Sequence, residues 1–494
     1  MKQLNRTEFT TKTYPTKIMQ FGEGNFLRGF VDWQIDHLNK VCNLNAGVSI
    51  IRPIDTDTPA LLDSQDGLYT AIVRGLDNGG EPVEDIRIIE CVNEEIPVYK
   101  EFDRYMDLAT CESLEFIFSN TTEAGIEFIE TDKIDDRPAK AFPAKLTQWL
   151  YKRYQHFEGA ADSGLVIIPC ELIDYNGKRL KKIVLQYCRL WNLETGFFDW
   201  LNASNDFCST LVDRIVPGYP RDEHEELERK LGYRDNFMVT GEYFHLFVIQ
   251  GPEKLEDMLH LKGSGLNVKI VDDIYPYKQR KVAILNGAHT AMVPLAYLAG
   301  IDSVGEVIAD SLFNAYIRQL IFDEIIPTLS LPRDDLESFA EDVIKRFQNP
   351  YIRHLLISIS LNSMSKLGTR IVPQLLKYVE INKQIPPLMA NAIAAQILFY
   401  RGLRDGETIP LLDSEEWLNL YNELWRRHDE GEIDLETLVQ SVLSAKWHWE
   451  TDLTQVPNLL RVVTTALGEF VERGVRAGLS THIKRSEKDG INRC

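Results

Sequence analysis

The sequence predicts an α/β fold in which a doubly wound parallel sheet is followed by a mostly α-helical domain. Two features support this: strand-like and helix-like segments alternate through the first half, and convincing strands vanish after about residue 275. The chain has 494 residues, more than one hydrophobic core usually organises, so more than one domain is expected. We place the domains at residues 1–275 and 276–494.

Short apolar runs in the first half have the length and composition of buried strands. Between the first two runs, residues 27–38 carry apolar side chains at helical spacing, and further helical patterns lie at 142–155 and 178–190. Strands and helices in alternation favour a parallel sheet joined by crossover helices. The predicted strands are 17–21, 48–51, 87–92, 114–118 and 164–168.

The second half has helical periodicity throughout, and prolines separate the periodic segments. No repeat of fixed period is visible, which argues against a solenoid. The predicted helices are 281–299, 304–326, 335–347, 372–381, 388–402, 414–428, 435–445 and 456–477.

Composition narrows the range of partners. Lys and Arg total 54 against 74 Asp and Glu, a net charge of −20, so the protein repels nucleic acid and anionic membranes. There is no apolar run long enough to span a bilayer and no signal-peptide pattern at the N-terminus. The seven cysteines form no CxxC pair, which favours free thiols in a reducing compartment. We expect a cytoplasmic protein with a small-molecule substrate; its oligomeric state stays open.

A glycine-rich loop, residues 22–28 (GEGNFLR), follows the first predicted strand and opens the first predicted helix. Gly22 and Gly24 allow backbone amides to approach a pyrophosphate, and the helix N-terminus adds partial positive charge. Leu27 stands where the full dinucleotide fingerprint has a third glycine. The context predicts a Rossmann-type NAD-binding domain; the alternative is a tight turn without a ligand.

Polar residues follow two other predicted strands. Asp55 or Asp57, after the second strand, could bind the adenosine ribose and so favour NAD over NADP, whereas the nearby Arg52 could do the opposite. Residues 119–123 (SNTTE) follow the fourth strand, where small hydroxyl side chains can bind a nicotinamide or its ribose. Their structural alternative is the capped start of a helix.

The most specific pattern is Lys281, Asn286 and His289 within residues 281–289 (KVAILNGAH). Asn286 and His289 are three apart and share a helical face, whereas Lys281 and Asn286 are five apart and diverge on a straight α-helix. Hydride transfer to a carbonyl needs a proton donor and hydrogen-bond donors aimed at the developing oxyanion. A lysine and an asparagine can supply these without a metal. The alternative is a surface lysine and a structural histidine.

At these residues the sequence resembles the mannitol dehydrogenase family of polyol-specific long-chain dehydrogenases. That family combines a Rossmann-type domain with a helical C-terminal domain and carries a Lys, an Asn five later and a His three beyond it, as in residues 281–290 (KVAILNGAHT). Further matching motifs are GxGxFxR at 22–28, QDGLYT at 65–70, Thr-Glu followed by Gly at 122–125, and VDRI at 212–215.

The resemblance implies roles for individual residues. Lys281 would be the general acid/base, Asn286 and Asn176 would form an oxyanion hole, and His289 would position the lysine or a substrate hydroxyl. The cofactor would be NAD, with no metal. Its expected contacts are Gly22, Gly24, Asn25, Phe26, Arg28, Asp55, Thr121, Thr122 and Glu123.

Departures from the polyol pattern point to substrate charge. Residues 169–177 (PCELIDYNG) replace a polyol-type SCDN segment but keep Asn-Gly, which resembles the hexuronate branch that interconverts tagaturonate and altronate. Lys278 stands where polyol members tend to carry a glutamate, and a cation there suits a carboxylate-bearing substrate. Lys366 and Arg370 are further candidates for binding that carboxylate; helix caps or surface pairs are their alternative.

Several alternatives remain at this point. Fructuronate reduction or a mannitol-type dehydrogenase activity would use the same residues. A catalytically silent NAD-binding regulator is a different class, but it would have no reason to keep the full set of Lys281, Asn286, His289 and Asn176. A metal hydrolase lacks support, since there is no HExxH or paired Cys/His spacing.

Overall fold

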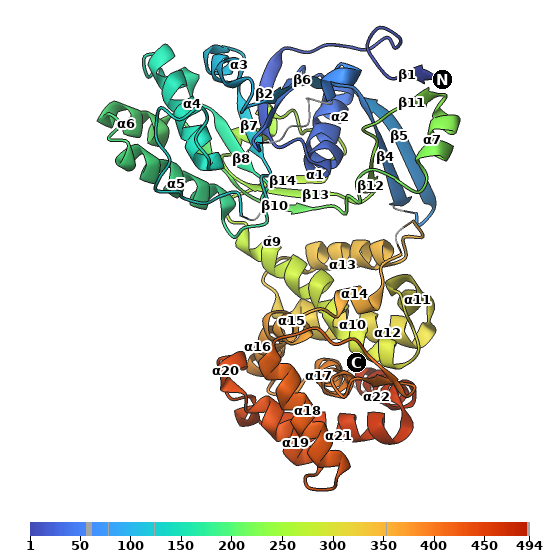
Figure 1. Cartoon of the computed structure of the whole chain (residues 1–494). Helices are drawn as coiled ribbons and strands as arrows, with labels where there is room; N and C mark the ends of the chain where they lie inside the picture. Colours follow the sequence, from blue (N-terminus) through green and yellow to red (C-terminus); the bar gives the residue numbers. More distant parts are fainter. Residues whose placement is uncertain (56–61, 78, 123, 352, 492–494) are drawn as a thin grey trace. The chain divides into compact units, whose positions relative to one another are not determined.

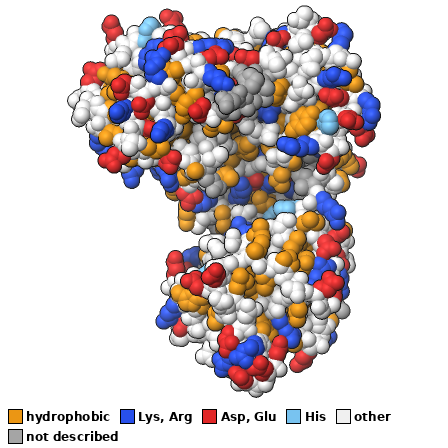
Figure 2. All heavy atoms as spheres, in the orientation of Figure 1, with side chains coloured by type: hydrophobic (Ala, Val, Ile, Leu, Met, Phe, Trp, Pro, Cys, Tyr) orange, Lys and Arg blue, Asp and Glu red, His pale blue; other side chains and the backbone are white. Residues whose placement is uncertain are grey.

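The computed structural model describes residues 1–55, 62–77, 79–122, 124–351 and 353–491. The chain forms two compact units, Met1–Ile274 and Tyr275–Cys494, which are described separately below (Figure 1). Within the described ranges, no helix has both the length and the apolar character needed to cross a bilayer. On the face drawn in Figure 2, acidic and basic side chains are interspersed over the surface.

The first unit is built on a six-stranded sheet in which every neighbouring pair is parallel. Its strand order is β6-β3-β2-β7-β8-β9: successive strands are added on one side of β2 as far as β6, and then on its other side from β7 to β9. This is the doubly wound Rossmann order, which confirms the predicted fold class. The strands are β2 (Thr16–Phe21), β3 (Gly47–Arg52), β6 (Val92–Pro97), β7 (Phe116–Ser119), β8 (Val166–Pro169) and β9 (Asp206–Phe207).

Both faces of this sheet are covered, and for that reason its strands are nearly continuous apolar runs. In β2, Ile18 packs into one core and Met19 and Phe21 into the other; in β7, Phe118 and Ile117 divide in the same way. The first face is covered by a continuous helix comprising α1 (Asn25–Leu27), a π-helical turn (Arg28–Asp32) and α2 (Trp33–Val41). The second is covered by α4 (Phe142–His156) and α5 (Asn176–Leu190).

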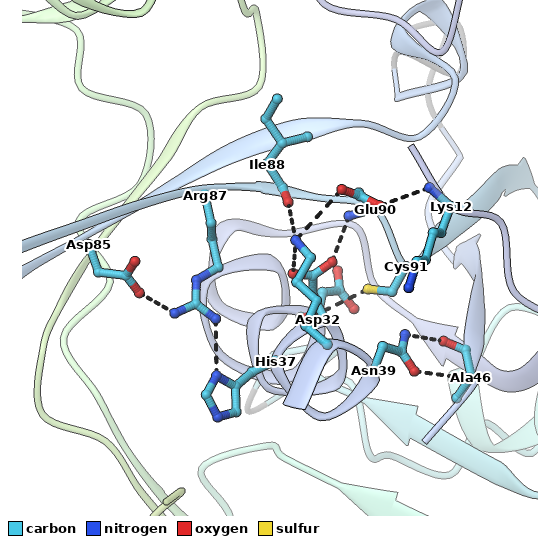
Figure 3. A network of polar contacts seen from close by, with 12 residues as sticks. Lys12, Asp32, His37, Asn39, Ala46, Asp85, Arg87, Ile88, Glu90 and Cys91 are labelled. Atoms are coloured by element: carbon cyan, nitrogen blue, oxygen red, sulfur yellow. Dashed lines mark hydrogen bonds and ion pairs between the residues drawn. The ribbon is translucent and has the colours of Figure 1, made fainter. Parts of the chain in front are cut away.

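Polar contacts attach the first helix to neighbouring strands and loops (Figure 3). The His37 Nε2 lies 2.8 Å from the Ser264 carbonyl oxygen and must donate to it, so its Nδ1 accepts from Arg87 Nη1 at 3.2 Å. Asn39 exchanges two hydrogen bonds with the backbone of Ala46, at 2.8 and 2.9 Å. These bonds fix the helix that begins at the glycine loop.

Smaller sheets complete the first unit, and one of them corrects a strand prediction. Residues 87–92 do not form one strand of the main sheet. Residues 87–89 end β5 (Pro82–Ile89), which pairs antiparallel with β4 (Tyr69–Leu76), and the main sheet resumes with β6. The remaining strands are β1 (Lys2–Gln3), β10 (Ser209–Asp213), β11 (Tyr233–Arg234), β12 (Val239–Glu242), β13 (Leu246–Gln250) and β14 (Val268–Val271).

Shorter helices fill the rest of the first unit. They are α3 (Phe102–Asp107), α6 (Thr195–Ala203), α7 (His224–Leu231) and α8 (Lys254–Met258), with 3₁₀ turns at Leu62–Gln65, Leu108–Thr110 and Ala161–Ser163.

The second unit is helical, as predicted, apart from the short hairpin β15 (Leu403–Arg404) and β16 (Glu407–Thr408). The predicted helix 304–326 is divided at Asp310, which leaves the helical conformation and caps the next helix by accepting from the Leu312 and Phe313 amides. The helices are α9 (Tyr275–Arg280), α10 (Gly287–Leu298), α11 (Val304–Ala309), α12 (Ser311–Gln319), α13 (Arg333–Phe347), α14 (Leu356–Ile359), α15 (Ser363–Arg370), α16 (Val372–Asn382), α17 (Pro387–Phe399), α18 (Glu415–Asp429), α19 (Leu435–Leu443), α20 (Lys446–Trp449), α21 (Leu459–Arg473) and α22 (Val475–Ile491).

The core of the second unit surrounds α17, which is buried on all sides and packs against α10 and α21. Helix α10 continues α9 through a π-helical segment, Lys281–Asn286, so residues 275–298 form one long helix. A second π segment, Leu320–Ile325, continues α12. Lys281, Asn286 and His289, three of the predicted catalytic residues, therefore lie on a helix held by the core of the second unit.

Candidate active site

The glycine loop has the geometry of a phosphate-binding turn. Gly22 has φ +115°, and a Cβ there would lie 2.9 Å from the Asn120 carbonyl oxygen, so only glycine fits. A Cβ on Gly24 would meet nothing within 4 Å, which leaves open space beside the helix start. No side chain caps this helix and no acid lies in its first turn. The N-terminal amides can therefore bind an anion such as a pyrophosphate.

The other predicted residues of this loop have distinct positions. Asn25 is exposed, and Phe26 stacks on Phe30 with ring centroids 5.0 Å apart. Arg28 is buried: its Nε donates to the Glu23 carbonyl at 3.1 Å, and its Nη2 donates to the Asn25 Oδ1 at 2.7 Å. The guanidinium group of Arg28 thus holds two parts of the loop together, and the exposed residues of the loop are Gly24 and Asn25.

At the end of β3, two opposing charges have different surroundings. Asp55 is exposed, whereas Arg52 is buried, forms an ion pair with Glu95 and lies 3.7 Å from Glu23. The positive charge of Arg52 is thus offset by acids of the protein itself, and Asp55 is available to a ribose diol. Asp57, the other acid considered, lies outside the described residues.

The segment after β7 is organised by Glu171, a residue that the sequence analysis did not single out. Its buried carboxylate accepts from the Ser119 Oγ (3.0 Å), the Thr121 amide (2.9 Å) and the Thr121 Oγ1 (3.0 Å). Burial raises the pKa of Glu171. Thr122 has φ +76°, and the next helix begins only at Phe142, so Thr121 and Thr122 are not helix caps. Glu123 lies outside the described residues.

Asn176 is fully buried, and its carboxamide is saturated by protein partners. Its Nδ2 lies 2.8–3.0 Å from the Pro169 and Glu171 carbonyl oxygens and the Thr210 Oγ1, and its Oδ1 accepts from the Gly177 and Thr210 amides. In this arrangement the amide joins the loop after β8 to β10. It has no donor left over for a substrate oxygen.

In the second unit, a π segment explains how Lys281 and Asn286, which are five residues apart, can lie on the same side of a helix. Backbone hydrogen bonds in a π turn join residues five apart instead of four. Lys281 and Asn286 are the first and last residues of this segment, so the wider turn brings them onto one side of the helix. Both are partly exposed, whereas Ala283, Ile284 and Leu285 between them are buried. Such turns often occur at functional sites.

His289 and Thr290 extend this site one turn further along α10. The His289 ring contacts those of Phe347 and His354, with centroids 4.5 and 5.2 Å away. Thr290 Oγ1 donates to the Asn286 carbonyl at 2.9 Å and lies 3.3 Å from the Arg370 Nη1, which donates to it. Arg370 is thereby placed beside the helix turn that carries Asn286.

Two further cations lie close in sequence or space to these residues. Lys366 is one turn before Arg370 on α15, and its Nζ donates to the Ile359 carbonyl at 2.7 Å. Burial lowers the pKa of both Lys366 and Arg370, with the Arg370 charge contributing to the shift at Lys366. Lys278 lies on α9 three residues before Lys281 and is partly exposed. Half-buried cations of this kind can bind an anion.

The first unit is a Rossmann fold with an open glycine loop, and the second is helical and carries Lys281, Asn286 and His289 on one long helix. Together these features define a two-domain dehydrogenase. Two family models match the chain: the mannitol dehydrogenase Rossmann domain over residues 16–263 and the mannitol dehydrogenase C-terminal domain over residues 273–471. The chain belongs to the mannitol dehydrogenase family.

Relatives and solved structures agree with this assignment. The chain is 56% identical over 476 residues to an altronate oxidoreductase of Klebsiella pneumoniae, covering 96% of this chain and 99% of that one. It is 54% identical over 482 residues to an altronate oxidoreductase of Yersinia enterocolitica, covering 98% and 100%.

Two solved structures share the fold at lower identity. A D-sorbitol dehydrogenase has a TM-score of 0.80 at 18% identity, covering 97% of this chain and 100% of that one. Pseudomonas fluorescens mannitol 2-dehydrogenase, in a ternary complex with NAD and D-mannitol, has a TM-score of 0.65 at 21% identity, covering 98% and 99%.

Proposed function

We propose that this protein is an NAD-dependent oxidoreductase that interconverts tagaturonate and altronate, with Lys281 as its general acid/base. The observation that carries the proposal is the π turn that joins Lys281 and Asn286, with Arg370 bonded beside it through Thr290. The names of relatives at 54–56% identity support the choice of substrate.

The glycine loop fits the coenzyme. The open space at Gly24 and the uncapped helix start suit the pyrophosphate, and Asp55 suits the adenosine ribose. Because Glu95 and Glu23 offset the charge of Arg52, that arginine is a poor partner for a 2′-phosphate, which supports NAD over NADP. When bound, the nicotinamide supplies or accepts the hydride.

The residues of the π turn handle the proton and the oxyanion. In the reductive direction the carbonyl carbon gains a hydride, and its oxygen gains a proton from the Lys281 ammonium. The Asn286 amide is suited to donate a hydrogen bond to that oxygen as charge develops on it. His289, one turn on, orients the lysine or a substrate hydroxyl. Asn176 supports the loop after β8, since its amide is already saturated.

Cations near this turn give the site its preference for a sugar acid. Arg370, Lys366 and Lys278 can neutralise the substrate carboxylate, which a net charge of −20 on the protein would otherwise repel. Fructuronate is a second substrate worth testing because it carries the same carboxylate.

The test is turnover of tagaturonate, fructuronate and fructose by the purified protein, with NADH and with NADPH. We expect the highest kcat/KM with tagaturonate and NADH, and activity that persists in a chelator. Lys281→Ala should reduce kcat by at least two orders of magnitude, the typical contribution of a general acid. Wild-type turnover by this variant, or a clear preference for fructose, would contradict the proposal.

A further inference from the structure

Two sequence motifs have no role in the proposed chemistry, yet both reach the same element. Tyr69, from residues 65–70 (QDGLYT), lies at the start of β4, and Arg214, from residues 212–215 (VDRI), directly follows β10. Both side chains are buried. Both contact the π turn Arg28–Asp32, which follows the glycine loop and continues the helix that the loop opens.

The contacts fall on two consecutive backbone carbonyls of this turn. The Tyr69 hydroxyl lies 3.0 Å from the Arg28 carbonyl oxygen, to which it donates, and 3.1 Å from the Asp32 Oδ2. The Arg214 Nη1 donates to the Gly29 carbonyl at 2.8 Å. A π turn departs from the regular α-helical bonding pattern. Tyr69 and Arg214 supply side-chain hydrogen bonds to two successive carbonyls of this turn.

The segment that carries Arg214 is packed closely against the turn. A Cβ on Gly29 would lie 2.9 Å from the Val216 side chain, so the approach requires glycine at that position. The Arg214 guanidinium also lies over the Trp33 ring, 4.1 Å from its centroid, and its Nε donates to the Glu242 carbonyl at 2.8 Å. The arginine is therefore held rigidly on both sides.

The π turn is linked to the glycine loop through Arg28. The backbone carbonyl of Arg28 accepts from Tyr69, while its side chain binds the Glu23 carbonyl and the Asn25 Oδ1. The Arg28 guanidinium lies over the Tyr69 ring at 5.2 Å. A shift of the turn would move Arg28 and, with it, both ends of the loop segment 23–25.

We propose that Tyr69 and Arg214 are positioning residues for the coenzyme: they fix the π turn so that Arg28 holds the glycine loop in its binding conformation. Neither residue needs to touch the coenzyme. The inference rests on the coenzyme site proposed above. It assigns to the QDGLYT and VDRI motifs a role in coenzyme affinity and separates that role from the proton chemistry at Lys281.

Tyr69→Phe tests the first contact, with NADH affinity measured directly by fluorescence titration. Loss of a buried hydrogen bond that holds the loop should raise the Kd for NADH roughly fivefold to tenfold. The KM for the sugar acid and kcat at saturating NADH should stay within about twofold of wild type, because the π turn at Lys281 is untouched. Tyr316→Phe is the matched control, since the Tyr316 hydroxyl makes an equivalent buried bond to the Leu388 carbonyl in the second unit.

Arg214→Lys tests the second contact, because a lysine keeps the charge but loses the fork geometry that serves two carbonyls. Its control is Arg153→Lys, since Arg153 is also buried in the first unit and binds carbonyls, including those of Ser163 and Cys111, away from the glycine loop. We expect a rise in the NADH Kd for Arg214→Lys alone, and a non-additive effect when it is combined with Tyr69→Phe.

The possible outcomes are distinct. If wild type binds NADH and both variants bind it equally well, the positioning role is wrong while the proposed function stands. If the control variants weaken NADH binding as much, the effect is general destabilisation and the inference is again overturned. If wild type does not bind NADH at all, the coenzyme site and this inference fail together.

Discussion

Asp32 is the last residue of the π turn beside the glycine loop, and its carboxyl group is fully buried. Burial raises its pKa to about 7, against hydrogen bonds from Tyr69 and Gln20 that lower it. A phenol has one proton, so Tyr69 can serve both the Arg28 carbonyl and Asp32 fully only when Asp32 is protonated and donates in return. The protonated carboxyl group is thus the form that this site accommodates best.

This leads to a prediction about pH. Because the folded pKa lies above the ordinary value of 3.8, the folded state binds the proton more tightly, and the stability contributed by Asp32 is lost as pH rises toward 7. Asp32→Asn removes that titration. The stability of the variant relative to wild type should increase between pH 5 and pH 8, by roughly 2 kcal/mol. Denaturant unfolding at both pH values measures it; a constant difference would contradict it.

The charge of Lys278 leads to a prediction about substrate preference. Lys278→Glu places a carboxylate three residues before Lys281, where it would repel an anionic substrate. We expect the KM for tagaturonate to rise about tenfold or more, and the KM for neutral fructose to change little, with the Kd for NADH as the control. An unchanged KM for tagaturonate would show that the carboxylate binds elsewhere.

The roles of some residues could be predicted from the sequence, whereas those of others could not. The residue types of Lys281, Asn286 and His289 suit the proposed proton transfer and oxyanion binding, but it was the family resemblance, and not their spacing, that favoured those roles. Glu171 could not be recognised in the same way, because its role depends on Ser119 at the end of β7 and on Thr121 just after it, 52 and 50 residues earlier in the chain. The saturation of the Asn176 amide likewise depends on Thr210, which only the folded chain brings close.

The π segment Lys281–Asn286 places the side chains of its first and last residues on the same side of the helix. The five-residue spacing of the pair seemed inconsistent with one helical face, because regular α-helical geometry was assumed. The strand 87–92 was mispredicted for a related reason: its alternating pattern suits a strand in either sheet, and long-range pairing with β4 decides the outcome. The alternation of strands and helices that did predict the main sheet is encoded locally in the apolar runs.

Deletions in the α9–α10 helix test the role of this turn. Removing Ala283 would let the π turn close into a regular α-helix, in which Lys281 and Asn286 become four apart and still share a face. Removing Ala288 from the regular helix would instead rotate His289 by about 100° relative to Asn286. We expect the Ala283 deletion to retain more activity than the Ala288 deletion, with NADH binding unchanged in both. The opposite ranking of kcat would refute the assignment.

The two units, Met1–Ile274 and Tyr275–Cys494, are each compact, and they carry separate parts of the proposed reaction. NADH alone should therefore stabilise the first unit selectively. In hydrogen exchange measured by mass spectrometry, amides in residues 16–33 and 115–122 should exchange more slowly with NADH, whereas those of α17 and α21 should not change. Protection confined to the second unit would contradict the placement of the coenzyme.

The π turn in the long helix has one more consequence. A turn that contains an extra residue divides the helix into two stretches with different rotational phase, Tyr275–Arg280 before it and Gly287–Leu298 after it. Under the proposed function, Lys278 of the first stretch contributes to substrate selection, whereas Lys281 and Asn286 lie within the turn and His289 lies on the second stretch. Substitutions on one part of this helix can therefore change the substrate preference from neutral to acidic sugars. The residues proposed to transfer the proton, on another part of the same helix, are kept.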